Sequence, residues 1–261
     1  KADSLIVHPD VRKMLLTMRA FNEGGRCFST YVAKQLDIVK FSADEAEKQQ
    51  AEQLVALLTP VAKAFMTDMA YESCNLGQMV FGGHGYVREW GQEQLVRDVR
   101  IAQIYEGTNG IQALDLLGRK VVANKGQFLE TYFTEIRAFI EKNTKQQVLA
   151  GFIKPLAGAL EKLEAVTDLI ITVQKTDKDM VGASATDYLA AFGLLSYAYM
   201  WAIMAEKASK QITNDFYQAK LYVGDFFVQR ILPRIDSHIN AIEAGSASLM
   251  VMPEGLFNYN H

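Results

Sequence analysis

The residues QMVFGGHGYVREWGQEQLVRDVRIAQIYEGTNGIQALDLLGRKVVA, at positions 78–123, decide how this chain is organised. The segment 79–91 breaks the helical rhythm of its surroundings, and a short helix is predicted over about 92–102. The segment IYEGTN at 104–109 is a second break, and it is followed by a helix predicted over about 110–123. Two glycine-bearing loops therefore flank one short helix, and loops held on a rigid scaffold commonly carry function.

The sequence on both sides of this segment is typical of helices. Apolar residues recur at helical spacing after Pro9, which suits the first turn of a helix. An acidic start at 42–45 precedes a second helical region that reaches about Leu76. The stretch 184–208 is rich in Ala, Leu, Tyr and Met, which is typical of a helix buried on much of its circumference. Downstream helices are predicted over 127–143, 147–174, 178–212 and 215–242.

These patterns predict an all-α fold. No sustained alternation of apolar and polar residues with hairpin turns occurs, which argues against a large sheet. The predicted architecture is a helical bundle over 1–124 followed by a helical extension domain over 125–261, with an extended tail after Ala244. Gly24 and Gly25 interrupt the first helix, and they predict either a kink or a close helix crossing.

Composition excludes several classes of protein. The chain has 261 residues, of which 49% are apolar and 22% charged, as in an ordinary globular protein. Its net charge of −3 argues against nucleic-acid binding, which needs clustered positive charge. Cys27 and Cys74 form neither a disulfide framework nor a zinc motif, so no metal site is expected. No apolar run approaches the roughly 20 residues of a membrane span. The chain starts at Lys1, without methionine, as a piece of a longer polypeptide would.

The first loop, Gly82-Gly83-His84-Gly85, offers backbone that a ligand can approach closely. It matches neither a dinucleotide fingerprint nor a phosphate-binding P-loop. On the residues alone, a plain connection between helices is favoured, with Gly83 retained for a positive φ. In the same interpretation Gln78 only caps or solvates a helix end.

The second loop centres on Glu106, which allows two interpretations. A glutamate at a helix start is ordinarily a solvated charge favoured by the helix dipole. Alternatively, Ile104, Tyr105 and Ile111 could enclose and desolvate the carboxylate, as suits a general base. Thr108 or Asn109 could cap the following helix.

Three motifs in order carry a family resemblance. QMVFGGHGYVREW (78–90), RDVRIAQIYEGTNGIQ (97–112) and ALDLLGRKV (113–121) resemble the carboxy-terminal helical domain of the acyl-CoA dehydrogenases. HPDVRKMLLTMRAFNEGGR at 8–26 resembles the first helix of that domain in the large bacterial members, which carry an extra helical domain at the end. The resemblance is dense from about His8 to Val121, and beyond that it rests on length and helical character.

The resemblance implies roles for individual residues. Glu106 matches the base that removes the α-proton of an acyl-CoA thioester while a hydride passes to FAD, and its backbone N–H matches a donor to the thioester carbonyl. Tyr105 and Gly107 match substrate-contacting positions, with Gly107 beside the thioester. The positions that match FAD contacts near its phosphates are Thr108, Asn109 and, more weakly, Gln112. The positions that match contacts to FAD of a neighbouring subunit are Gln78, Gly82 and Gly83.

The resemblance also implies partners. A neighbouring subunit's FAD implies a homodimer or homotetramer, and the family's electron acceptor is an electron-transferring flavoprotein. We expect a bacterial, cytoplasmic enzyme, no nucleic acid and no membrane span. The family's first helical domain, its β-domain and its pyrophosphate-gripping arginine have no match here. We therefore expect these 261 residues alone to bind FAD weakly or not at all, and to be inactive.

Two alternatives stay open. An acyl-CoA oxidase would use the same base and reoxidise its flavin with oxygen, and a non-catalytic helical oligomerisation module would keep the scaffold alone.

Other noticeable residues receive structural interpretations. An ion-pair cluster is expected for Arg97, Asp98 and Arg100. Packing is expected for Tyr86 and Trp90, whereas His84 has no partner at metal or triad spacing. Core-filling roles are expected for Met200, Met204, Met250 and Met252.

Overall fold

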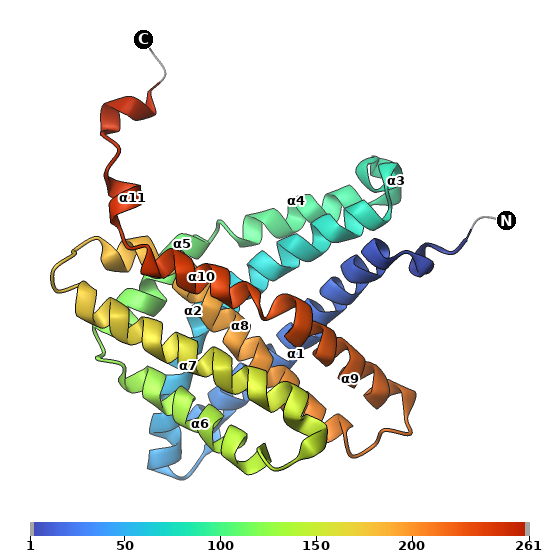
Figure 1. Ribbon diagram of the computed structural model, residues 1–261, viewed down its shortest axis with the longest axis horizontal. Coiled ribbons are helices and arrows are strands. Elements are labelled where there is room, and N and C mark those ends of the chain that lie inside the picture. Colours follow the sequence, from blue (N-terminus) through green and yellow to red (C-terminus); the bar gives the residue numbers. More distant parts are fainter. Residues whose placement is uncertain (1–2, 259–261) are drawn as a thin grey trace.

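A computed structural model describes residues 3–258 and contains helices and no strand over that range. The longer helices are α1 (Pro9–Phe41), α2 (Glu45–Val80), α4 (Gln92–Ala102), α6 (Gln127–Asn143), α7 (Ala150–Val173), α8 (Met180–Ala208), α9 (Asp215–Phe226) and α10 (Arg234–Glu243). The shorter ones are α3 (Gly83–Tyr86), α5 (Asn109–Leu114), α11 (Ala247–Met250) and the turns Leu5–Val7, Arg88–Trp90, Asp115–Val122, Gln147–Leu149, Phe227–Ile231 and Glu254–Phe257. The predicted all-α class is confirmed (Figure 1).

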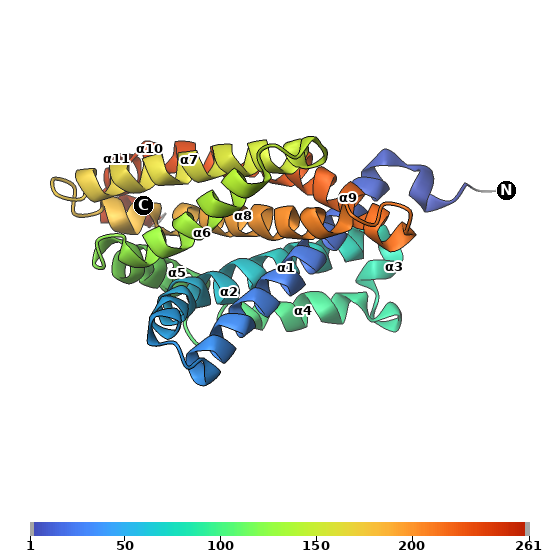
Figure 2. The same ribbon diagram turned by 90° about the horizontal axis from the view of Figure 1, so that it is seen from below.

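Helix α8 occupies the centre of the molecule. Figure 2 shows α7 and α10 on one side of α8, α1 and α2 on its other side, and α4 beyond α2. Almost every residue of α8 from Tyr188 to Ala202 is buried, so this helix has no polar face. The predicted burial of 184–208 is therefore confirmed, because neighbours surround α8 on all sides.

Local signals start α1 and α2 where the sequence predicts. Pro9 opens α1, where the missing N–H costs no helical hydrogen bond. The Asp44 carboxylate caps α2 by accepting hydrogen bonds from the backbone N–H of Ala46 (2.9 Å) and Glu47 (3.3 Å). Helix α2 runs to Val80, four residues past the predicted end, because Gly77 and Gln78 stay helical.

The Gly24-Gly25 pair is a close helix crossing, since α1 continues through it as one helix. A Cβ at Gly24 would lie 2.8 Å from the Tyr197 ring of α8, and a Cβ at Gly25 would lie 2.7 Å from the Tyr197 hydroxyl. An even tighter contact occurs at Gly193 of α8, where a Cβ would lie 2.2 Å from the Phe65 ring of α2. Glycine at these positions lets the helix axes approach to a distance that no larger residue allows.

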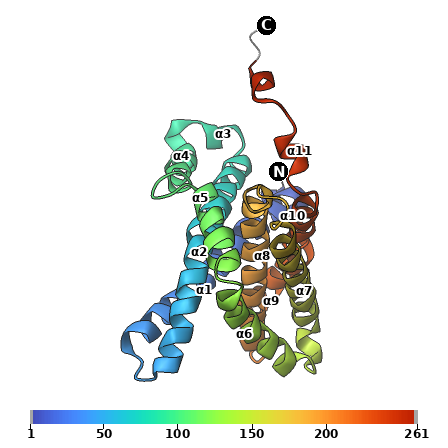
Figure 3. The ribbon, with the colours of Figure 1, turned by 90° about the vertical axis from the view of Figure 1, so that its left-hand side faces the viewer.

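The second half of the chain completes the core of the first half. One continuous cluster of buried side chains runs from Ala20 of α1 to Ile242 of α10. The predicted extension therefore shares its buried cluster with the bundle, and α8 packs against α1 and α2. Figure 3 shows this close association of α8 with the α1–α2 pair.

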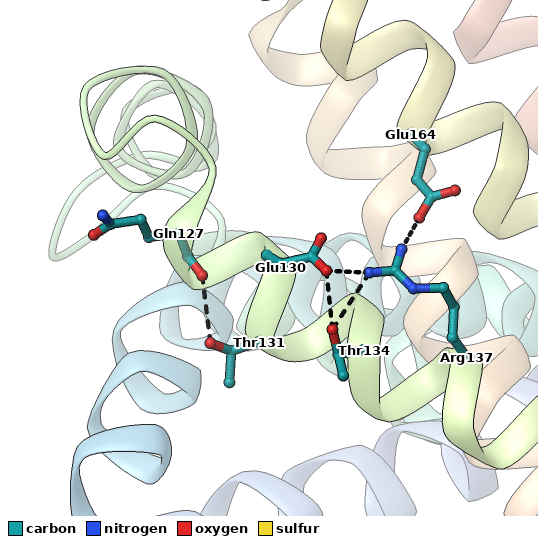
Figure 4. A network of polar contacts seen from close by, with 6 residues as sticks. All are labelled: Gln127, Glu130, Thr131, Thr134, Arg137 and Glu164. Atoms are coloured by element: carbon teal, nitrogen blue, oxygen red, sulfur yellow. Dashed lines mark hydrogen bonds and ion pairs between the residues drawn. The ribbon is translucent and has the colours of Figure 1, made fainter. Parts of the chain in front are cut away.

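Polar contacts fix α6 against its neighbours. Arg137 of α6 forms ion pairs with Glu130, two turns earlier on the same face of α6, and with Glu164 of α7 (Figure 4). Thr131 donates a hydrogen bond to the Gln53 side chain of α2 at 2.6 Å. Helix α6 therefore links α7 to α2 across the boundary between the two predicted domains.

Two expectations about the end of the chain need correction. The helix predicted over 215–242 is divided by a π-helical turn at Phe227–Ile231 and by Pro233, which has no N–H to continue the ladder. The tail contains the short helical segments α11 and Glu254–Phe257, and it projects from the body (Figure 1). Residues 259–261 lie outside the described range.

The methionine prediction holds for only half of the set. Met200 is fully buried and Met204 packs against the core. Met250 and Met252 are 61% and 42% exposed, because they lie in the projecting tail.

Among residues 3–258, two helices are long and apolar enough to cross a membrane by length and mean hydropathy alone. They are α2 and α8, with windows of mean hydropathy 1.2 and 1.4. The α8 window is 83% buried within the fold, as is typical of the core helix of a globular domain.

Candidate functional site

The first glycine loop lies where α2 ends and the chain turns back into α4. Gly82 adopts a left-handed conformation, with φ +59°, which corrects the expectation that Gly83 carries the positive φ. Gln78 donates a hydrogen bond from Nε2 to the Gly85 carbonyl at 3.2 Å and so braces the turn. A Cβ at Gly82 or Gly83 would meet no atom within 4 Å, so the backbone here is open to a ligand.

Aromatic residues form a small cluster beside this loop. Trp90 packs edge-on against His84, with ring centroids 4.9 Å apart, and against Phe81 at 6.3 Å. Trp90 nevertheless stays 55% exposed. Tyr86 is 80% exposed and is not in the cluster, so its expected packing role is wrong for the described chain.

The second loop holds Glu106 in an unusual backbone conformation. Glu106 has φ +50° and Gly107 has φ +85°, so two consecutive residues are left-handed. Lys125 is the one other non-glycine residue with positive φ among residues 3–258. A left-handed conformation costs a residue with a Cβ about 1–2 kcal/mol, and such strain gathers at functional sites.

A polar network centred on Asn109 fixes this loop to α2. The Asn109 side-chain oxygen accepts hydrogen bonds from Lys63 Nζ at 2.8 Å and from the Thr67 hydroxyl at 3.3 Å. Its amide donates to Asp68 Oδ1 at 2.6 Å and to the Ala64 carbonyl at 3.2 Å. Every polar atom of the Asn109 side chain is thus engaged within the fold. Asn109 therefore holds the loop against α2.

The same network continues to the end of α4. Gln103 donates from Nε2 to Asp68 Oδ1 at 2.6 Å, and Arg100 donates to Gln103 Oε1 at 2.7 Å. The Arg100 guanidinium also lies over the Tyr71 ring of α2. Asp68 Oδ1 therefore accepts hydrogen bonds from both Gln103 and Asn109, the residues at the beginning and the end of the loop.

The expected ion-pair cluster on α4 is not formed. Within residues 3–258, no ion pair joins Arg97, Asp98 and Arg100, because Asp98 accepts a hydrogen bond from Gln94 and Arg100 turns toward Gln103. Sequence reasoning also missed Lys63, Thr67 and Asp68. The usable signal was the four-residue spacing of Lys63 and Thr67, which places both polar side chains on one face of α2.

The residues after Glu106 support the loop from the other side. Thr108 caps α5, with its hydroxyl accepting from the Ile111 N–H at 3.4 Å. Gln112 donates from Nε2 to the Glu106 carbonyl at 3.4 Å and lies 3.0 Å from the position of a Cβ at Gly107. The Glu106 N–H has no acceptor within residues 3–258, so this donor is available to a ligand.

The expected enclosure of the Glu106 carboxylate does not occur within this chain. Glu106 is exposed, and its neighbours Ile104, Tyr105 and Ile111 are 48%, 52% and 57% exposed. They lie outside the core because the loop is attached to α2 through the polar side chain of Asn109 and not through its apolar side chains. Further apolar side chains of α4 and α5 are also exposed, at Leu95, Ile101 and Leu114. Such a patch is typical of a surface that another surface covers.

The two loops are not brought together. They lie at opposite ends of the 11-residue helix α4, which spans roughly 16 Å at the rise of an α-helix (Figure 1). Gln78, Gly82 and Gly83 therefore form one location, and Glu106, Gly107 and Thr108 form another.

Comparisons with known proteins agree with this description. Residues 1–121 match the family model "Acyl-CoA dehydrogenase, C-terminal domain", and residues 132–253 match the model "Acetyl-CoA dehydrogenase C-terminal like". The two models meet between 121 and 132, beside the predicted boundary at 124/125. The helices that they cover nevertheless share one core.

Curated relatives match along nearly the whole chain. The chain is 34% identical to the 3-methylmercaptopropionyl-CoA dehydrogenase of Ruegeria pomeroyi, over 94% of this chain and 42% of the relative. It is 30% identical to the broad-specificity linear acyl-CoA dehydrogenase FadE5 of Mycobacterium tuberculosis, over 96% of this chain and 43% of the relative. The chain thus spans about two-fifths of the length of these relatives.

Among solved structures, Caenorhabditis elegans ACDH-11 in complex with C11-CoA has the same fold. Its TM-score is 0.74 at 22% identity, with 95% of this chain and 40% of that chain covered. The two family models, the relatives and the fold agree with the three sequence motifs. The chain belongs to the acyl-CoA dehydrogenase family.

Proposed function

We propose that this chain supplies the catalytic base of an FAD-dependent acyl-CoA dehydrogenase, with Glu106 removing the α-proton of an acyl-CoA thioester. The observation that carries the proposal is the strained backbone at Glu106, together with the network that holds it there. A solvated helix-start glutamate needs neither a left-handed backbone nor a supporting network.

The loop provides two groups for this chemistry. The Glu106 carboxylate accepts the α-proton, and the unpaired Glu106 N–H donates to the thioester carbonyl. This donor stabilises the negative charge that develops on the carbonyl oxygen as the proton leaves. Gly107 lets the thioester approach the backbone, and Tyr105 forms part of the apolar surround. Asn109 acts through the loop, as a positioning residue.

The chain also offers surfaces that fit FAD. Bound FAD would accept the hydride from the β-carbon of the thioester. Thr108 would contact the FAD of its own site, and the open backbone at Gly82 and Gly83, with Gln78, would contact the FAD of a neighbouring subunit. The separation of the two loops along α4 supports this division between two FAD molecules.

The exposed apolar face explains how the base becomes desolvated. In this proposal, the parts of the enzyme that hold FAD and substrate cover Ile101, Ile104, Tyr105 and Ile111. Covering them removes water from Glu106, which favours proton abstraction near neutral pH. The 261 residues alone would therefore hold FAD weakly and show no turnover, which flavin fluorescence and an activity assay of the isolated chain would measure.

The proposal includes the wider setting. We propose that the electrons pass to an electron-transferring flavoprotein and that the enzyme is a homodimer or homotetramer. We also propose a bacterial cytoplasmic location, which the two free cysteines and the bacterial relatives support. If the enzyme formed peroxide and did not pass electrons to the flavoprotein, it would be an acyl-CoA oxidase.

The decisive experiment compares the FAD-loaded enzyme with its Glu106→Gln variant by anaerobic stopped-flow with acyl-CoA thioesters. We expect flavin bleaching to slow by about 10²- to 10⁴-fold, the usual contribution of a general base. FAD content and thioester affinity should stay within a factor of two or three. Near-normal bleaching in the variant would overturn the proposal.

A further inference from the structure

A groove lies between α1 and the second half of α2, and its side chains are only partly covered. Its volume is about 360 Å³, and its lining is mainly apolar, with Met18 and Phe21 of α1 and Met66 and Met69 of α2. The 18-residue apolar window of α2 is 39% buried within the fold, against 83% for the window of α8. The chain's own side chains therefore leave much of the apolar surface of α2 uncovered.

The tail, residues 245–258, is a second apolar segment that the fold leaves uncovered. Neither α11 nor the turn Glu254–Phe257 contains a buried residue. Figures 1 and 3 show the tail standing clear of the other helices. Its apolar side chains are 42–75% exposed, at Leu249, Met250, Val251, Met252, Leu256 and Phe257. Such a run of exposed apolar side chains is typical of a segment that binds another surface.

The base of the tail is fixed, so the tail has a defined direction. Gly245 follows α10 in a left-handed conformation, with φ +72°. The Ser246 hydroxyl, in a residue that is 8% exposed, donates a hydrogen bond to Asp177 Oδ2 at 2.6 Å. Asp177 precedes α8, whereas Tyr197 of the groove lies in the second half of α8, roughly 25 Å along the helix. Because the tail leaves the body at this anchor (Figure 1), it does not cover the groove of its own chain.

The groove and the tail are both apolar, and they carry opposite charges. Arg26 is the one charged residue that lines the groove, and Glu254 is the one charged residue among positions 245–258. Both are exposed, and neither forms an ion pair within residues 3–258. Since one chain carries both surfaces, two copies can cover each other's groove at the same time. Such an exchange has two-fold symmetry and closes at two subunits.

We propose that the tail of one copy of this chain docks in the α1–α2 groove of a second copy, and that the exchange is reciprocal. The apolar side chains of the tail cover Met18, Met66 and Met69, whose flexible side chains adapt to the shape of a bound surface. Glu254 of one copy pairs with Arg26 of the other. This inference rests on the homo-oligomer of the proposed function, and it names the segments that form one of its contacts.

The first experiment uses the two free cysteines of the FAD-loaded enzyme. Cys74 lines the groove, whereas Cys27 does not. One cysteine is introduced at each of the apolar tail positions in turn, from Leu249→Cys to Phe257→Cys. Under mild oxidation, we expect at least one of these variants to form a disulfide with Cys74 of another copy, seen as a covalent dimer on denaturing gels without reductant and identified by peptide mapping. The dimer should persist with Cys27→Ala and disappear with Cys74→Ala.

The second experiment exchanges the two charges in the variant that cross-links best. Glu254→Arg and Arg26→Glu should each slow cross-linking by roughly fivefold, the upper end for an exposed ion pair. The double variant should restore the rate to within a factor of two. Arg12→Glu, which reverses another exposed arginine of α1 outside the groove, is the matched control and should not rescue Glu254→Arg.

The outcomes separate this inference from the proposed function. No covalent dimer at any tail position, a dimer that survives Cys74→Ala, or a disulfide to Cys74 of the same chain would each overturn the exchange of tails. Flavin bleaching and a homo-oligomer in sedimentation would then still support the proposed function. A monomeric unaltered enzyme would overturn the proposed homo-oligomer as well.

Discussion

The interior around α8 and the face formed by α4 and the Glu106 loop differ in the burial of their apolar side chains and in the strain of their backbone. Around α8, apolar side chains are buried and helices touch at glycines. On the α4 face, apolar side chains such as Ile101 are about half exposed, and the backbone is strained at Glu106. The interior is closed by this chain's own side chains, whereas apolar side chains on the α4 face stay exposed.

The difference indicates where stability and activity reside. Close packing around α8 stabilises the fold, because dense interiors tolerate little change in volume. The Glu106 loop depends on polar contacts to α2 that leave its apolar side free. Substitutions in the interior should therefore affect unfolding, and substitutions on the face should affect turnover.

The largest effect is expected at the tightest contact. Gly193→Ala places a Cβ 2.2 Å from the Phe65 ring, and we expect a loss of about 3 kcal/mol in the free energy of unfolding, from overpacking. Urea denaturation followed by circular dichroism measures this loss. Gly158→Ala is the matched control, because a Cβ there meets nothing within 4 Å, and it should stabilise by about 0.5–1 kcal/mol. Similar unfolding midpoints for the two variants would contradict a close-packed α8.

The next effect tests the network that positions the loop. Asn109→Ala leaves Asp68 and Lys63 without their central partner, at an expected cost of about 1–3 kcal/mol. Because the loop then loses its geometry, kcat should fall by about tenfold or more with FAD content unchanged. Rapid kinetics and thermal unfolding measure both quantities. A variant that unfolds earlier but turns over normally would show that Asn109 serves the fold alone.

The third prediction separates strain from function. Glu106→Gly should remove the left-handed penalty and raise the free energy of unfolding by up to about 1 kcal/mol, while abolishing flavin reduction. Lys125→Gly, at φ +55°, should stabilise similarly and leave turnover intact. Denaturant unfolding of both variants gives the comparison. Destabilisation by Glu106→Gly would show that the conformation is not strained.

A smaller effect concerns pH. The hydrogen bond from Lys142 Nζ to Glu206, at 2.9 Å, holds the pKa of the Glu206 carboxyl below its ordinary value. The ion pair therefore stabilises the fold above the ordinary glutamate pKa, and this contribution is lost as pH falls through the lowered pKa. Lys142→Met should cost about 1 kcal/mol or less at pH 7, and less in acid. A stability cost of Lys142→Met that grows as the pH falls would contradict a lowered pKa of Glu206.

The smallest effect on stability should come from the exposed face. Ile101→Ser removes a side chain that is 57% exposed, so the unfolding free energy of this chain should change by less than about 0.5 kcal/mol. Turnover or assembly of the FAD-loaded enzyme should fall, since the covering surface loses an apolar contact. Unchanged kinetics and unchanged mass in solution would indicate that this face stays open to water.

Much of the fold could be predicted from local signals. The helices at 92–102 and 127–143, the cap at Asp44 and the helix start at Pro9 follow from periodicity and capping residues, which act within a few positions. The division of 215–242 was missed because an apolar pattern continues through the π-helical turn before Pro233. The exposure of Ile104 and Tyr105 was missed because an apolar side chain looks alike in sequence whether its own chain or another surface covers it.

Residue identity and short-range spacing are enough to predict the helical class and the order of the motifs, because both depend on residues a few positions apart. Three features arise only from contacts in the folded chain: α8 packs into the core of the first half, Asn109 hydrogen-bonds to α2, and Tyr197 lies against Gly25. These contacts join residues tens to hundreds of positions apart. Their geometry follows from packing volume and from the pairing of buried polar groups, which no local pattern encodes.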